Sequence, residues 1–270
     1  MAALAAADPL ASFTRVVNGR VEVLANGAVA VIRMNRPDKR NALDAEQIAA
    51  LGKAFGWLAA EEGVNAAVLT GAGKSFCAGG DISMFLSINT DNALSFTRRG
   101  YDLLRPLETG HKPVIAAVSG HCLAGGLEIA LACDFIIAGA SAKFGMAEVD
   151  LGLIPGWGGT VRLGSAVPVR LARQLVLTCE RLTAERAQGL GLVNEVLPDD
   201  AAALARAIEL AAHIARQPPL AVRAAKLVLN AIDGGVDASL ALEGSLAAGL
   251  FSTTAVTSRV RQWVDQSKAK

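Results

Sequence analysis

Two glutamates, Glu128 and Glu148, lie in segments that are otherwise mostly apolar. Glu128 follows Gly125-Gly126 and enters an apolar run with no other charge until Asp134, and Glu148 lies in a second apolar stretch. A fully buried glutamate is rare unless it is paired or takes part in function. Two such residues beside glycine-rich turns predict a site for acid and base catalysis, with the pKa values shifted by burial.

Two glycine turns could supply a second element of chemistry. The turns Ala78-Gly79-Gly80 and Gly125-Gly126 each follow a segment expected to be a strand. Glycine allows backbone shapes that leave N–H groups free and lets a ligand approach closely. Two such N–H groups aimed at one point would form an oxyanion hole. Either turn alone is compatible with a plain loop, but their combination with two glutamates favours an active site.

The elements that must position these groups follow from the pattern of the chain. Asn26-Gly27 between two apolar runs predicts a hairpin, and Asp44 is expected to cap a helix that ends near Ala60. Buried strands are expected at 66–70, 114–118 and 135–138, and helices within 92–108 and at 125–133. Further helices are expected at about 169–178, 184–189, 200–216, 219–231, 237–250 and 255–267. The chain therefore predicts an α/β fold of strand-strand-helix units, followed by a helical region.

The composition limits the class of protein. The chain has 270 residues, 52% hydrophobic and 19% charged, which is typical of a compact globular protein with one large or two small domains. The net charge is +1, from 26 basic and 25 acidic residues, and gives no reason to expect nucleic acid or an anionic membrane as a partner. No apolar run reaches the length of a membrane span.

Cysteines and the N-terminus bear on the compartment. The four cysteines Cys77, Cys122, Cys133 and Cys179 form no CxxC pair, and we expect buried, reduced thiols and a cytoplasmic location. Residues 1–15 lack the basic start and long apolar core of a secretory signal. A weak organellar presequence remains an alternative there, although a frayed tail is favoured.

Several familiar motifs are absent. Gly71-Ala72-Gly73-Lys74-Ser75 resembles the end of a P-loop, but Val68 stands where that motif requires glycine. The chain also has no G-x-S-x-G elbow of a serine hydrolase. His111, His121 and His213 lack the spacing of metal ligands, so no metal site is predicted.

Four segments together resemble the enoyl-CoA hydratase/isomerase family, also called the crotonase family. They are RPDKRNAL (36–43), KSFCAGGDI (74–82), HCLAGGLEIALACDFIIA (121–138) and FGMAEVDLGLIPGWGGT (144–160). The resemblance extends from about Val21 to Val264. It implies a crotonase-like spiral core with the acyl-CoA site over 1–198 and a C-terminal helical oligomerisation region over 199–270. It also implies an acyl-CoA substrate, no separate cofactor, and a homo-oligomer that is a trimer or a dimer of trimers.

The family's roles can be carried onto matching residues. In this resemblance the N–H groups of Ala78 and Gly125 hold the thioester oxygen, Glu128 activates water, and Glu148 protonates the α-carbon. The residues implied in CoA binding are Lys39, Arg40, Ala42, Ala78, Gly79, Gly80 and Asp81, and those implied in the acyl pocket are Met84, Phe85, Gly156 and Trp157. Lys39 and Arg40 could equally form an ordinary solvated basic loop.

The number of carboxylates favours hydration of a 2-enoyl-CoA. Family members that catalyse other reactions often lack one of the two glutamates, but an enoyl-CoA isomerase or another crotonase-type lyase or hydratase remains the alternative. Asp150 adds a third acid nearby, with a cap or a surface ion pair as its ordinary interpretation. Trp157 stands where the family usually has a small residue, so it either reshapes the acyl pocket or packs elsewhere. The C-terminal segment lacks the D-x-x-E-G pattern common in the family, and RNA binding is disfavoured by the charge balance.

Overall fold

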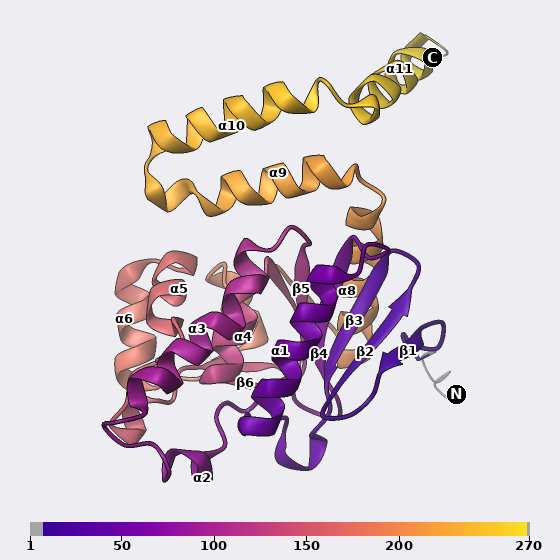
Figure 1. The fold of residues 1–270 in the computed structure, drawn as a ribbon. Coiled ribbons are helices and arrows are strands. Elements are labelled where there is room, and N and C mark those ends of the chain that lie inside the picture. Colours follow the sequence, from indigo (N-terminus) through magenta and orange to yellow (C-terminus); the bar gives the residue numbers. More distant parts are fainter. Residues whose placement is uncertain (1–7, 269–270) are drawn as a thin grey trace.

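The structure is a computed structural model and describes residues 8–268. Residues 1–7 of the predicted N-terminal tail lie outside this range. Sheet and helices form a layered body, and the last helices extend from it as an arm (Figure 1). No helix in residues 8–268 combines the length and the apolarity needed to cross a bilayer.

A seven-stranded sheet forms the centre of the body. Its order is β1 (Thr14–Val17), β2 (Val21–Asn26), β3 (Val29–Met34), β4 (Ala66–Gly71), β5 (Val114–Val118), β7 (Phe135–Gly139) and β10 (Glu195–Leu197). The pairs β1–β2 and β2–β3 are antiparallel, and every pair from β3 onward is parallel. The hairpin predicted at Asn26-Gly27 is confirmed, since Asn26 pairs with Val29. The predicted α/β fold is also confirmed.

A second sheet has three very short strands. It consists of β6 (His121–Leu123), β8 (Lys143–Gly145) and β9 (Leu182–Thr183), in that order. Strands of two or three residues carry too little alternation to be recognised in a sequence. This small sheet nevertheless brings segments around 121, 143 and 182 together beside the first turn of a helix that begins at Gly125.

The helices agree with the predicted pattern, with two additions. They are α1 (Ala45–Ala60), α2 (Ile82–Phe85), α3 (Ala93–Thr109), α4 (Gly125–Ala132), α5 (Gly159–Ala166), α6 (Val169–Thr178), α7 (Ala184–Gly189), α8 (Asp200–Ala215), α9 (Pro219–Asn230), α10 (Val236–Leu250) and α11 (Thr254–Lys268). Asp44 caps α1 as expected, because its side chain accepts a hydrogen bond from the N–H of Gln47. The short helices α2 and α5 were not predicted.

The core lies on both faces of the large sheet. One face packs on α1, α3 and α4, and the other is covered by α8, whose Ala203, Ala207 and Ala211 are buried against it. The helix α8 therefore covers the sheet, although it begins the predicted C-terminal region. The division at 198/199 stays a prediction.

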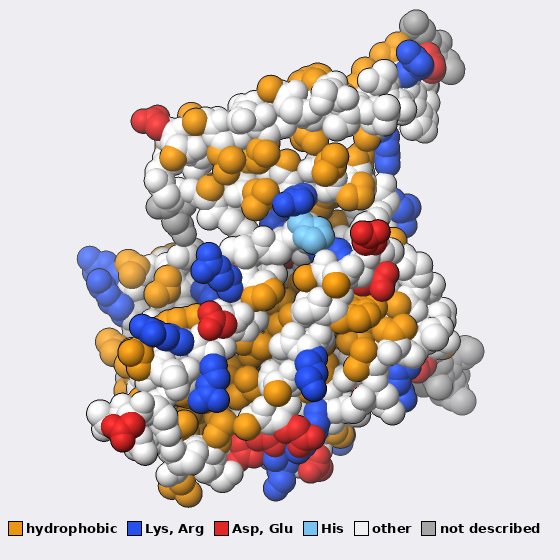
Figure 2. All heavy atoms as spheres, viewed as in Figure 1, with side chains coloured by type: hydrophobic (Ala, Val, Ile, Leu, Met, Phe, Trp, Pro, Cys, Tyr) orange, Lys and Arg blue, Asp and Glu red, His pale blue; other side chains and the backbone are white. Residues whose placement is uncertain are grey.

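The arm that follows has an uncovered apolar surface. The helices α9 and α10 pack against each other, and α11 continues beyond them (Figure 1). Large apolar side chains on the arm are exposed, including Leu229, Val236, Leu240 and Phe251. Figure 2 shows further apolar side chains along the space between α9 and α10.

All four cysteines are free thiols. Cys77, Cys122 and Cys133 are buried, as predicted. The prediction is wrong for Cys179, which is only partly buried. It is the C-cap residue of α6 and adopts the left-handed conformation (φ 54°).

Candidate active site

A cavity of about 770 Å³ brings the predicted site residues together. Four segments line it: the loop that contains Lys39, the turn and helix at 78–85, the start of α4, and the stretch 147–157. Every predicted site residue except Gly79 contributes to its wall, namely Lys39, Arg40, Ala42, Ala78, Gly80, Asp81, Met84, Phe85, Gly125, Glu128, Glu148, Gly156 and Trp157. Gly79 lies behind the wall, with φ 102° and almost no space between it and Ala124.

Glu128 is held by two backbone donors. It lies in the first turn of α4, and its side chain is buried, with 3% of the residue exposed. Its Oε1 accepts hydrogen bonds from the N–H of Trp157 at 2.7 Å and of Gly159 at 2.8 Å. Burial raises the pKa of Glu128, while the two N–H donors and Arg162 oppose that rise. The other oxygen, Oε2, is left for a ligand.

Glu148 has a different environment. It precedes the single helical turn at Val149–Leu151, and its Oε2 is buried with no hydrogen-bond partner among the described residues. Burial, followed by the negative charge of Glu128, raises the pKa of Glu148 to about 7. A group with that pKa exchanges protons readily at neutral pH. The two carboxyls therefore face one cavity with unequal proton affinity.

The two glycine turns lie side by side, because the segments before them pair. The N–H of Cys77 donates to the carbonyl of His121, and the N–H of Leu123 donates back to Cys77. At Gly126, an added Cβ would lie only 2.3 Å from the carbonyl oxygen of Cys77, so this approach requires glycine.

The structure contradicts the role predicted for Ala78. Its N–H donates to the carbonyl oxygen of Arg40 at 3.0 Å and is therefore not free to hold a substrate oxygen. The N–H groups of Gly80 and Gly125 have no acceptor within residues 8–268. A Cβ placed on Gly125 would lie 3.8 Å from the nitrogen of Gly80 and 3.9 Å from Oε2 of Glu128, so these groups surround one small space.

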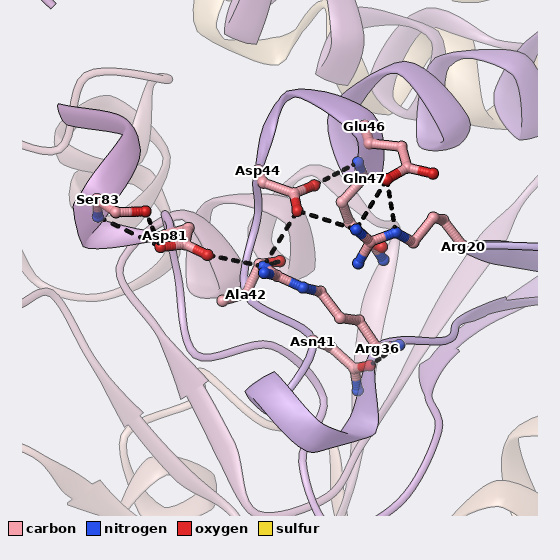
Figure 3. A network of polar contacts seen from close by, with 9 residues as sticks. All are labelled: Arg20, Arg36, Asn41, Ala42, Asp44, Glu46, Gln47, Asp81 and Ser83. Atoms are coloured by element: carbon pink, nitrogen blue, oxygen red, sulfur yellow. Dashed lines mark hydrogen bonds and ion pairs between the residues drawn. The ribbon is translucent and has the colours of Figure 1, made fainter. Parts of the chain in front are cut away.

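The loop at 36–44 is fixed to the turn by a polar network (Figure 3). The guanidinium of Arg36 contacts Asp81 at 2.9 Å and Asp44 at 3.3 Å, and it also donates to the carbonyl of Ala42. Hydrogen bonds from Ser83 and then from Arg36 lower the pKa of Asp81, which also caps α2. The carboxylate of Asp81 thus has a positioning role here, although the residue lines the cavity.

Cations collect at the same side of the cavity. Lys39 and Arg40 form no ion pair within the described chain, and both are exposed. Among the lining residues that were not predicted, His121 and Arg181 reach this side through the small sheet. Burial lowers the pKa of His121, and the positive charges of Arg40 and Arg181 lower it further. Its Nδ1 lies 3.2 Å from the hydroxyl of Ser75.

A second part of the lining, from 84–97 and 151–157, is apolar except for Thr97. It consists of Met84, Phe85, Ile88, Ala93, Phe96, Thr97, Leu151, Leu153, Ile154, Gly156 and Trp157. Asp150 is exposed and does not line the cavity. Among the residues that the structure describes, no group of three or more His, Cys, Asp or Glu side chains could hold a metal ion.

Comparisons with known proteins agree with this arrangement. The family model for enoyl-CoA hydratase/isomerase matches residues 25–269. The chain is 38% identical over 244 residues to a short-chain-enoyl-CoA hydratase of Clostridium acetobutylicum, which covers 90% of this chain and 93% of that protein. The chain belongs to the enoyl-CoA hydratase/isomerase family. The family resemblance seen in the four sequence segments is thereby confirmed.

Other relatives in the enoyl-CoA hydratase/isomerase family have different named substrates. A 2,3-dehydroadipyl-CoA hydratase of Escherichia coli is 38% identical over 226 residues, which are 83% of this chain and 88% of that protein. Among solved structures, an enoyl-CoA hydratase from Bacillus anthracis superposes with a TM-score of 0.87 at 33% identity, over 92% of this chain and 97% of that chain. The fold is therefore the crotonase fold.

Proposed function

We propose that this protein is an enoyl-CoA hydratase, which adds water reversibly across the 2,3-double bond of a 2-enoyl-CoA thioester. The observation that carries the proposal is the pair Glu128 and Glu148, two carboxyls with raised pKa values that face one cavity beside two free backbone N–H groups. Acid, base and oxyanion donors are the three elements that this addition requires. The reaction needs no cofactor beyond the CoA of the substrate.

The N–H groups of Gly80 and Gly125 would bind the thioester oxygen. When water adds to C3, negative charge moves onto that oxygen, and fixed donors stabilise it without reorganisation. Losing one such donor typically lowers the rate by about 10²–10³. Gly80 takes the place first predicted for Ala78, because the N–H of Ala78 is already bonded to Arg40.

The two glutamates would divide the proton transfers. Oε2 of Glu128 is free of protein donors and close to the oxyanion space, so it is suited to accept a proton from the attacking water. Glu148 holds a proton at a pKa of about 7 and is suited to deliver it to the α-carbon. The pair then carries one proton before the reaction and one after it, as a reversible hydration requires.

The cationic side of the cavity would hold the phosphates of CoA. Lys39, Arg40 and Arg181 line this side and supply positive charge, and the ammonium and guanidinium groups are well suited to phosphate. The apolar lining from 84–97 and 151–157 would hold the acyl chain. None of these lining residues is a cation that could pair with a second carboxylate, such as the one in the substrate named for the E. coli relative. We therefore propose an uncharged acyl group.

The helical arm would serve in self-association. Its exposed leucine, valine and phenylalanine side chains form an apolar surface that a second copy of the chain could cover. We propose a homotrimer or a dimer of trimers, with α8 as part of the body and α9–α11 at the contact. Mass measurement in solution tests this directly, since a monomer at micromolar concentration would contradict it.

The experiment that tests the function is a product assay on purified protein. Crotonyl-CoA should lose its conjugated thioester absorbance and give 3-hydroxybutyryl-CoA. A 3-enoyl-CoA offered in parallel should remain unchanged over the same time. Conversion of the 3-enoyl-CoA without hydration of crotonyl-CoA would instead support the isomerase alternative, since the family is that of enoyl-CoA hydratases and isomerases.

A further inference from the structure

The indole of Trp157 occupies an unusual position between the cavity and α3. The residue lines the cavity, yet only 5% of it is exposed, so most of the ring is embedded in the wall. The ring is packed against the backbone of Gly100, where an added Cβ would lie 2.1 Å from Cγ and Cδ1 of the indole. The absence of a side chain at position 100 therefore creates the space that the indole fills.

Two phenylalanines continue this wall. The ring of Phe96 lies 5.5 Å from that of Trp157, and the ring of Phe85 lies 5.9 Å from that of Phe96, edge to face. Phe85 in turn packs on Gly80, where an added Cβ would lie 2.7 Å from its ring. An aromatic wall thus extends from a proposed oxyanion donor to Trp157.

The backbone fixes where this wall meets the substrate. The N–H of Trp157 donates to Oε1 of Glu128. The backbone that carries the indole is therefore in direct contact with the carboxylate proposed to activate water. If Glu128 acts at C3, the residue that carries this ring is bonded directly to the group beside that carbon, and its ring lines the same cavity. The ring nitrogen is buried without a partner in the described chain. A phenylalanine at position 157 would avoid the cost of this buried, unpaired N–H, but it would fill less volume. The advantage of tryptophan at this position is therefore its larger ring.

We propose that Trp157 sets the depth of the acyl pocket and restricts the enzyme to short acyl chains. The proposal rests on the proposed hydratase function and adds the residue that determines chain length. The backbone of α3 closes the space behind the indole, so a longer chain cannot enter there unless the ring is removed. Each methylene that gains a buried position is worth about a fourfold gain in kcat/KM.

The test compares 2-enoyl-CoAs of four, six, eight and ten carbons as substrates of the wild type and four variants. For the wild type, kcat/KM should fall beyond six carbons. In Trp157→Ala the ratio of kcat/KM for eight carbons to that for four should rise at least about tenfold, from two or more newly buried methylenes. Trp157→Phe should change the ratio in the same direction by less, and it serves if the alanine variant does not fold.

Gly100→Ala supplies the opposite change. The new Cβ would overlap the indole, so one of them must move. We expect the ring to move away from α3 and into the cavity. The preference should then shift further toward four carbons. Trp57→Ala is the matched control, because Trp57 is a partly buried indole on α1 that packs on the core outside the cavity. It should leave the chain-length ratio unchanged.

The outcomes separate this inference from the proposed function. A Trp157→Ala enzyme with the wild-type chain-length ratio would overturn the inference even while crotonyl-CoA is hydrated. If the wild type hydrates no enoyl-CoA, the proposed function fails first. Calorimetry with saturated acyl-CoAs of the same lengths then still tests the pocket, since affinity for the longer chains should rise in Trp157→Ala, and an unchanged affinity profile would refute the role of Trp157.

Discussion

Glu128 and Glu148 face the same cavity, but the segments that carry them differ in construction. Glu128 belongs to a helix and keeps one oxygen bonded to two backbone N–H groups. Glu148 precedes a single helical turn and has a buried oxygen without a donor. Burial is the largest cause of the raised pKa in both, and backbone N–H groups oppose it in both; Arg162 lowers the pKa of Glu128 further, whereas the charge of Glu128 raises that of Glu148. With both carboxyls buried, the sign of the neighbouring charge therefore favours Glu148 as the group that keeps the shared proton.

Replacing either carboxyl should cause the largest loss of activity. Glu148→Gln and Glu128→Gln should each lower kcat for hydration by about 10²–10⁴, because each removes one proton transfer and leaves the cavity in place. Affinity for a saturated acyl-CoA, measured by calorimetry, should stay close to that of the wild type. Near-normal turnover in Glu148→Gln would contradict the proposed division of roles.

Disturbing the support of Glu128 should have the next largest effect. In Gly159→Ala the new Cβ would lie 2.8 Å from Cγ of Glu128, so the carboxylate must move. A displacement of this kind typically lowers kcat by about 10²-fold. The control is Gly164→Ala on the same helix, where no atom lies within 4 Å of the added Cβ. Equal activity of the two variants would show that the position of Glu128 is not critical.

The pH dependence should reveal where the proton resides. Hydration needs Glu148 protonated, and its pKa is raised to about 7, so kcat/KM should fall about tenfold per pH unit well above 7. Removing the charge of Glu128 should lower the pKa of Glu148. The residual activity of Glu128→Gln should therefore begin to fall at lower pH than that of the wild type. If the activity of Glu128→Gln began to fall at the same pH as that of the wild type, the charge of Glu128 would have no effect on the pKa of Glu148, and the proposed coupling would be refuted.

The smallest effect is expected at the third acid of the segment. Asp150 is exposed and outside the cavity lining. Asp150→Asn should keep kcat/KM within about twofold and change the free energy of unfolding by less than about 0.5 kcal/mol, as is usual for such a surface position. Steady-state kinetics with crotonyl-CoA and thermal unfolding check this. A large loss of activity would mean that the acid is not confined to Glu148.

Much of the site could be predicted from residue types and their neighbours in the sequence. Glu128 and Glu148 stand out as charges in apolar segments, and glycine at 125 and 126 marks the start of a helix at the cavity. Hairpin and helix limits followed from local signals, such as Asn26-Gly27 and the cap Asp44, because these act over a few residues.

The errors and omissions share a physical cause, which is contact between distant segments. In the turn at 78–80, the carbonyl of Arg40 accepts from the N–H of Ala78 and so leaves that of Gly80 free. The sequence does not show that Arg40 lies beside this turn. Arg181 and His121 reach the cavity through strands of two and three residues that lack a recognisable pattern. The position of Trp157 depends on the missing side chain of Gly100 in another helix.

The hydrogen bond from the N–H of Ala78 to the carbonyl of Arg40 joins the two parts of the protein that would hold the two ends of a long substrate. Arg40 lies at the cationic side proposed for the phosphates, and two residues beyond Ala78 comes the N–H proposed for the thioester oxygen. Contacts with a phosphate far from the reacting carbons can therefore hold the reacting end in place, so binding energy from the nucleotide is converted into rate. A thioester of pantetheine, which lacks the nucleotide, should accordingly lose kcat as well as affinity.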